Sequence, residues 1–155
     1  GGDDDEASEE RCYLGDDFAL LCQVAELQEE KGNVASALAA YEEAWRLQQQ
    51  MGKVGPKAVQ LLTRIGALHG LSSDGYDAAA LMHESRQLEA WSAARQLRKE
   101  QGSLSTAEGT KLLTDLAAVK GAQGDQEGTL ELLEEAKQNL AQLGALRTPG
   151  GAAVL

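Results

Sequence analysis

Apolar residues recur along this chain at steps of three and four positions, which is the spacing of one face of an α-helix. The pattern predicts six helices, starting near residues 16, 33, 56, 76, 105 and 125 and separated by glycine-containing turns. Because the turns within the first, middle and last pairs are short, we expect each pair to form an antiparallel hairpin. The predicted helical domain is 16–144, between an acidic arm, 1–15, and an irregular tail, 145–155.

Each predicted helix carries an apolar stripe that we expect to face the core. In chain order the stripes are Phe18, Leu21, Cys22, Ala25 and Leu27; Ala37, Leu38, Tyr41, Ala44, Trp45 and Met51; Val59, Leu62, Ile65 and Leu68; Ala78, Leu81, Met82, Leu88, Trp91 and Leu97; Leu112, Leu113, Leu116 and Val119; and Leu130, Leu133, Ala136 and Leu140. Glycines are expected to end the helices, at Gly32, Gly52, Gly70, Gly102 and Gly144. Asn33 and Asp125 are expected N-caps, and residues 105–108 have the S-x-x-E form of a capping box beginning at Ser105.

The helices also repeat in sequence. Residues 21–52 resemble residues 113–144 at a shift of 92, so that Leu21, Val24, Ala25, Leu38 and Ala44 fall on Leu113, Leu116, Ala117, Leu130 and Ala136. A middle copy is shifted by 41, which places Leu62, Ile65, Gly66, Ala78, Met82 and Ser85 on Leu21, Val24, Ala25, Ala37, Tyr41 and Ala44. Such a period is typical of stacked helical repeats. The expected repeats are 16–54, 56–101 and 105–144, and we place the extra length of the middle copy in the fourth helix, near Trp91.

The first copy resembles a tetratricopeptide repeat. Leu21, Val24, Ala25, Gly32, Ala37, Tyr41 and Ala44 stand at that family's spacing. The repeat length near 41 and the Gly55-Pro56 start of the second copy are similar to the kinesin-light-chain-like variant. The later copies depart from the pattern at Ser73, Ser85, Lys120 and Thr129. The resemblance implies an all-α solenoid of three antiparallel helix hairpins; the alternative is an unrelated six-helix bundle.

In tetratricopeptide arrays the first helix of each pair lines the concave face, so the resemblance also implies a partner-binding groove. The expected groove residues are Ala19, Cys22, Gln23, Glu26, Gln60, Thr63, Arg64, Ala67, Lys111, Thr114 and Ala118. These side chains are mostly small and neutral, and would admit a partner helix or an extended peptide. The family's clamp for C-terminal carboxylates is not expected, because Arg64 and Lys111 are the only cations here and asparagine is lacking.

The two tryptophans are candidate interface anchors, since exposed tryptophans often contribute strongly to binding. Trp45 follows a helix face already filled by Tyr41 and Ala44, and either faces outward or packs on the neighbouring repeat. Trp91 either packs on the fifth helix or contacts a partner.

Charge is unevenly distributed. The net charge is −11, of which residues 1–17 contribute −7, and the candidate acidic arm consists of Asp3, Asp4, Asp5, Glu6, Glu9 and Glu10. An acidic arm on a weakly acidic domain argues against nucleic acid or an anionic membrane surface as the partner, because both require clustered cations. No run of 18 apolar residues occurs in the sequence, so direct membrane insertion is not expected, although docking on a membrane-protein complex stays open.

The sequence shows no constellation typical of catalysis or metal binding. Glu26, Glu29 and Glu30 are interpreted as a solvated helix face, His69 as a helix-end residue and His83 as a surface residue. Cys12 and Cys22 lack metal-ligand spacing and are expected to be reduced thiols, with a disulfide between them as the alternative. We therefore expect no cofactor, no metal and no small-molecule substrate.

Together these patterns predict a non-catalytic protein–protein interaction scaffold, an accessory or structural subunit of a larger multiprotein complex. Its partners would be other protein subunits, with the acidic arm adding electrostatic attraction. The alternative is a free adaptor that binds short peptide segments in the groove. An intracellular, soluble location is expected, cytoplasmic or organellar. Because the sequence begins at Gly1, it is read as a processed protein or a fragment, and the loss of a transit peptide stays open.

Overall fold

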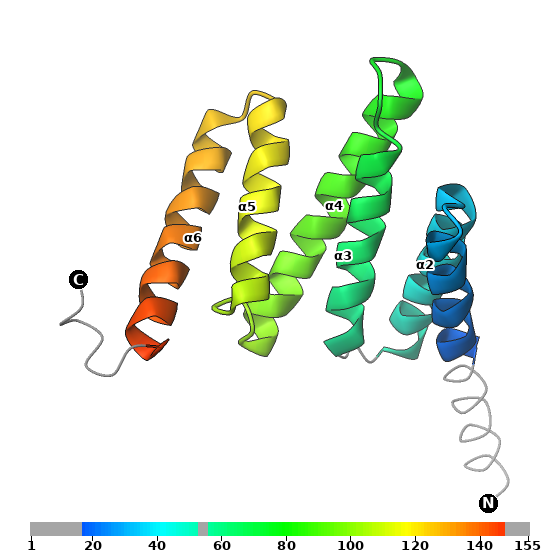
Figure 1. Cartoon of the computed structure of the whole chain (residues 1–155), viewed down its shortest axis with the longest axis horizontal. Coiled ribbons are helices and arrows are strands. Elements are labelled where there is room, and N and C mark those ends of the chain that lie inside the picture. Colours follow the sequence, from blue (N-terminus) through cyan, green and yellow to red (C-terminus); the bar gives the residue numbers. More distant parts are fainter. Residues whose placement is uncertain (1–16, 53–55, 148–155) are drawn as a thin grey trace, which may run out of the picture.

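The computed structural model describes residues 17–52 and 56–147, and within them it contains six α-helices and no strand (Figure 1). The helices are the first helix, residues 17–30, then α2 (Val34–Met51), α3 (Pro56–Leu71), α4 (Ala78–Gln101), α5 (Ala107–Ala122) and α6 (Gln126–Arg147). The predicted all-α class is confirmed. The acidic arm, Cys12 and the last eight residues lie outside the described part of the chain.

Successive helices run antiparallel and stand side by side in chain order (Figure 1). The extensive contacts join α2 with α3, α3 with α4, α4 with α5 and α5 with α6, and they are richest within the α3–α4 and α5–α6 pairs. Small residues such as Ala25, Ala44, Ala94 and Ala117 are almost fully buried, which lets neighbouring helices approach closely. The core is therefore a series of helix-to-helix layers along the array.

Three of the five predicted glycine stops, Gly32, Gly52 and Gly102, have the expected geometry, and Gly32 closes the turn after the first helix with φ of 79°. Gly52 and Gly102 follow the last residues of α2 and α4 and take the left-handed conformation, with φ of 68° and 72°. That conformation costs little only without a Cβ atom. Gly70 does not end α3, which continues to Leu71. The last helix was predicted to end at Gly144, but it continues to Arg147, because a single glycine in a helix interior is tolerated.

Two of the predicted N-terminal caps are wrong in detail. The cap of α5 is Thr106 and not Ser105, since the Thr106 hydroxyl accepts a hydrogen bond from the Gly109 N–H at 3.0 Å. Asn33 stands at the start of α2, but its side chain donates to Gln28 Oε1 at 2.7 Å instead of capping the helix. The Asp125 carboxylate does cap the start of α6, accepting from the Gly128 N–H at 2.9 Å.

The register of α4 differs from the prediction. Leu81 and Met82 are exposed, and the face that packs on α3 carries Gln87 and Trp91 instead. The reason lies on α3, where Gly66 and Gly70 have no side chain and leave room for Trp91 and Gln87 respectively. Close helix approach over these glycines selects that face of α4.

This packing also corrects the alignment of the repeats. The buried α2 residues Ala37, Ala40, Tyr41 and Ala44 correspond in burial to Gln87, Ala90, Trp91 and Ala94, which is a shift of 50 rather than 41. The extra length of the middle copy therefore lies before the packed part of α4. Trp91 occupies the place of Tyr41 and does not belong to an extension.

Several other positions predicted to be buried are exposed. They are Leu27 on the first helix, Ala78 at the start of α4, and Leu130, Leu133 and Leu140 on α6. Within the described residues, the exposed leucines lie on outer sides of the array, where no further helix packs against them. The inner face of α6 is formed by Leu132, Ala136 and Asn139.

Candidate functional site

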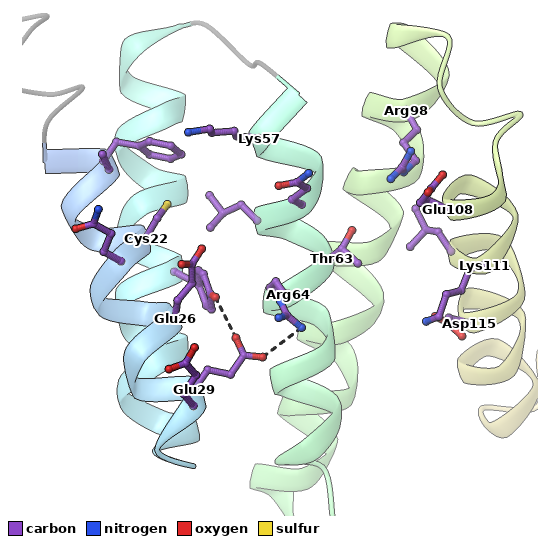
Figure 2. A pocket seen from close by; sticks show the side chains of 18 residues that line it. Cys22, Glu26, Glu29, Lys57, Thr63, Arg64, Arg98, Glu108, Lys111 and Asp115 are labelled. Atoms are coloured by element: carbon purple, nitrogen blue, oxygen red, sulfur yellow. Dashed lines mark hydrogen bonds and ion pairs between the residues drawn. The ribbon is translucent and has the colours of Figure 1, made fainter.

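A groove of about 840 Å³ lies between the first helix, α3 and α5 (Figure 2). Eight of the eleven predicted groove residues line it: Ala19, Cys22, Gln23, Glu26, Gln60, Thr63, Arg64 and Lys111. Ala67, Thr114 and Ala118 do not. Sequence reasoning missed ten lining residues: Phe18, Glu29, Glu30, Tyr41, Lys57, Leu61, Arg98, Glu108, Leu112 and Asp115. Two of these, Tyr41 and Arg98, come from α2 and α4, so a rule that considers only the first helix of each pair cannot find them.

Charged side chains stand on the walls of the groove, and smaller neutral ones lie between them. The wall formed by the first helix carries the carboxylates of Glu26 and Glu29 (Figure 2), and Glu30 of the same helix also lines the groove. Lys57 and Arg64 stand on α3. Farther along, Arg98, Glu108, Lys111 and Asp115 complete the opposite side. The arrangement offers separate acidic and basic positions to a bound segment.

A hydrogen-bonded group joins three helices at the acidic wall. The Tyr41 hydroxyl donates to Glu29 Oε2 at 3.0 Å, and Arg64 Nη1 lies 3.3 Å from Glu29 Oε1 (Figure 2). Burial, and next the hydrogen bond to Glu29, raise the pKa of Tyr41 to about 12, so the hydroxyl stays a donor at neutral pH. The prediction that Glu29 belongs to a solvated face is wrong, because its side chain is only one quarter exposed. Glu26 and Glu30 are exposed.

The opposite wall is held by contacts within its own elements. Lys111 Nζ lies 2.9 Å from Asp115 Oδ2, one helical turn away. Arg98 Nη1 donates to the Ser103 carbonyl at 3.2 Å, which ties this side chain to the turn after α4. Within the described residues Lys57 has no ion-pair partner, so it is available to a bound group.

Cys22 is the thiol in the groove, and its environment makes it a weak nucleophile. Burial raises the pKa of the thiol, the Glu26 carboxylate raises it further, and Lys57 lowers it in part. A thiol that stays protonated at neutral pH reacts slowly. The two histidines are not among the residues that line the groove. Over residues 17–52 and 56–147, no group of three His, Cys, Asp or Glu residues is arranged to hold a metal ion.

The two histidines meet away from the groove. His69 on α3 is buried, with its Nδ1 2.9 Å from His83 Nδ1 and its Nε2 2.8 Å from Glu42 Oε1. With both rings neutral, His69 donates from Nε2 to Glu42 and accepts at Nδ1 from His83. Protonation of both rings would leave two N–H donors facing each other. His69 lies in the last turn of α3, as expected, but it is buried and not a solvated cation at the helix end. His83, interpreted as a surface residue, is only partly exposed and is paired with His69.

Because of this histidine pair, we expect the folded chain to lose stability in mild acid. Burial lowers the pKa of His69 below its ordinary value of 6.5, Glu42 opposes that shift, and His83 and Arg86 add to it. Because the unfolded chain then binds the proton more readily, the contribution to stability is complete above pH 6.5 and is lost as the pH falls below that value. Thermal unfolding followed by circular dichroism should show Tm falling over this range, and the dependence should flatten in His69→Gln.

A second variant separates this effect from general acid destabilisation. Glu42→Gln removes the group that favours protonation of His69, so the fall in Tm with acid should become steeper. An unchanged pH profile in both His69→Gln and Glu42→Gln would show that other groups control acid stability.

Of the two candidate anchors, Trp91 is not exposed as an interface anchor would be. It is buried between α3 and α4, and its Nε1–H donates to the Thr63 carbonyl at 3.0 Å. Trp45 is partly buried against the core.

The chain matches no protein-family model, and comparisons with curated proteins and with solved structures give no match. Of the helices in the described residues, none has the length and apolar character needed to span a bilayer.

Proposed function

We propose that this chain is a non-catalytic interaction scaffold that holds a segment of a partner protein in the groove between the first helix, α3 and α5. One observation carries the proposal: three helices far apart in the sequence line a single groove of about 840 Å³. That volume suits a few side chains of a bound segment. The protonated Cys22 thiol supports a binding role over nucleophilic catalysis.

The proposed architecture is a tetratricopeptide-like solenoid of three stacked hairpins. The pairing of α3 with α4 and of α5 with α6, with weaker contacts between pairs, supports it. So does the recurrence of buried positions, in which Ala44 corresponds to Ala94 in the second pair and Ala136 in the third. A stack of this kind places the first helix of each hairpin beside one shared surface.

The charges of the groove indicate what the bound segment carries. Glu26 and Glu30 are exposed and have no ion pair within the described residues, so a lysine or arginine of the partner fits that wall. Lys57 would receive a carboxylate. The neutral stretch around Gln60 and Thr63 lets the partner backbone approach. We expect a segment with separated basic and acidic residues.

The accessory-subunit role is preferred over a free adaptor because of the ends of the array. Leu20, Leu27, Leu130 and Leu140 are all more than half exposed. Monomeric soluble proteins seldom leave several large apolar residues exposed on one helix face, and such faces usually contact another protein.

Two substitutions of an alanine by tryptophan, one inside the groove and one outside it, test this proposal. Peptides would be selected from a random display library on the immobilised full chain, and their affinity measured by titration calorimetry. Ala19→Trp puts an indole in the groove and should weaken binding at least about tenfold. Ala118→Trp changes an exposed alanine on α5 outside the groove and should leave affinity unchanged. Equal affinity for both variants would place the binding site elsewhere, and failure to select any peptide would count against the function.

A further inference from the structure

The exposed apolar residues on the outer side of the first helix occupy repeat positions that are buried inside the array. Leu20, Val24 and Leu27 are 59%, 41% and 57% exposed. At a shift of 41 the corresponding α3 residues are Leu61, Ile65 and Leu68, which are 4%, 5% and 1% exposed. The corresponding α5 residues are Leu112, Leu116 and Val119, all buried or partly buried. On α3 and α5, which both contact the preceding hairpin, these positions are buried or partly buried, whereas on the first helix they are exposed within the described residues.

The outer side of α6 has the complementary pattern. Leu130 and Leu133 are 58% and 46% exposed, and Leu140 continues the stripe. At a shift of 92, Leu130 and Leu133 correspond to Leu38 and Tyr41 of α2, which are buried, and α2 contacts α3 of the following hairpin. Positions that are buried on α2, which a further hairpin follows, are thus exposed on α6, which no described helix follows.

The exposed apolar sides of the first helix and of α6 match the two helix surfaces that meet where one hairpin packs on the next. Within the chain, α2 packs on α3 and α4 packs on α5, and in each case the second helix of one hairpin meets the first helix of the next. We propose that copies of this chain associate end to end, with the first helix of one copy packed on α6 of the next through Leu20, Val24 and Leu27 against Leu130, Leu133 and Leu140.

The same observations argue against a symmetric pairing of two first-helix sides. Such pairing would place one first helix on another, and in the described array α3 and α5 do not pack extensively on each other. A junction between unlike sides leaves one open side on each partner, so association continues and mass grows with concentration. Because every copy is acidic, with a net charge of −11, added salt should strengthen the association by screening repulsion.

Sedimentation velocity on the full chain tests this directly. The wild type should show an average mass that rises beyond that of a dimer as concentration increases. Val24→Glu and Leu133→Glu each put a carboxylate into one half of the junction, and each should weaken self-association at least about tenfold. Leu81→Glu changes a leucine on α4 that lies outside both halves and is more exposed than Val24 and Leu133, and this variant should associate like the wild type.

Mixing the two variants gives the sharpest result. The Val24→Glu chain keeps an intact α6 side and the Leu133→Glu chain keeps an intact first-helix side. Their mixture should therefore form a one-to-one heterodimer that does not grow further. A wild type that stays monomeric at every concentration would overturn the proposal, as would a mixture with no heterodimer. Sensitivity to Val24→Glu alone would indicate symmetric pairing and would overturn it too. Circular dichroism of each variant establishes that it is folded.

Discussion

Replacing Gly109 with alanine should destabilise the chain by about 3 kcal/mol, because the added methyl group would collide with the backbone. Gly109 lies in the first turn of α5 and is buried. A Cβ atom there would overlap the carbonyl group of Leu104. That carbonyl also accepts a hydrogen bond from Asn139 Nδ2 at 3.1 Å, and the Gly109 N–H is held by the Thr106 cap at 3.0 Å. Relief of the overlap would break one of these contacts.

Gly121 on the same helix provides the matched control. It is exposed, and a Cβ atom there would come no closer than 3.6 Å to the Thr129 side chain. Gly121→Ala should therefore stabilise the chain, by at most about 1 kcal/mol because Gly121 lies in the last turn of α5. Urea unfolding followed by circular dichroism measures both variants. A change of the same sign and size in the two would contradict the proposed collision at Gly109.

Trp91→Ala should lower the free energy of unfolding by about 3–5 kcal/mol. The indole is buried against Gly66, and its Nε1–H donates to the Thr63 carbonyl at 3.0 Å. Removing the ring leaves a cavity between α3 and α4, and Gly66 has no side chain to fill it. Urea unfolding followed by the fluorescence of the remaining Trp45 measures the loss.

Two control variants separate the contribution of the hydrogen bond from that of ring burial to this loss of stability. Trp91→Phe keeps an aromatic ring but loses the hydrogen bond to Thr63, so it should cost less than Trp91→Ala. Trp45→Ala should also cost less, because Trp45 is only partly buried. A Trp91→Ala chain as stable as the wild type would mean that the indole is not part of the α3–α4 core.

The helix pattern was predictable because local rules determine most of it. The spacing of apolar residues gave six helices, and glycines such as Gly52 and Gly102 marked the ends of α2 and α4. Eight groove residues were located because residues on one side of the first helix, α3 and α5 share a surface. That inference needed the family resemblance as well as the period.

The register of α4 was not predictable from its own sequence. Leu81 and Met82 are more apolar than Gln87, yet Gln87 is buried. The choice is made by Gly66 and Gly70 on another helix, which leave the space that Trp91 and Gln87 fill. The spacing of apolar residues is a property of each helix separately and does not reflect this complementarity between helices.

The pairing of polar side chains was missed for a similar reason. His69 meets Glu42 from α2 and His83 from α4, partners 27 and 14 positions away in the sequence. Glu29 likewise receives the Tyr41 hydroxyl from the neighbouring helix. On α6 the apolar stripe itself was real, but a stripe does not show whether a neighbouring helix covers it.

Among α2 to α6, the extensive contacts join consecutive helices, and this affects how the chain folds. Contacts that are close in sequence require little loop closure, which favours rapid folding that starts within one hairpin and spreads to its neighbours. The α3–α4 pair has the richest packing and neighbours on both sides, so it is the natural starting point. The same organisation allows the array to unfold locally from its ends. Because α6 can separate without disrupting α3 and α4, its amide hydrogens should exchange with a lower free energy of opening than those of α3 and α4.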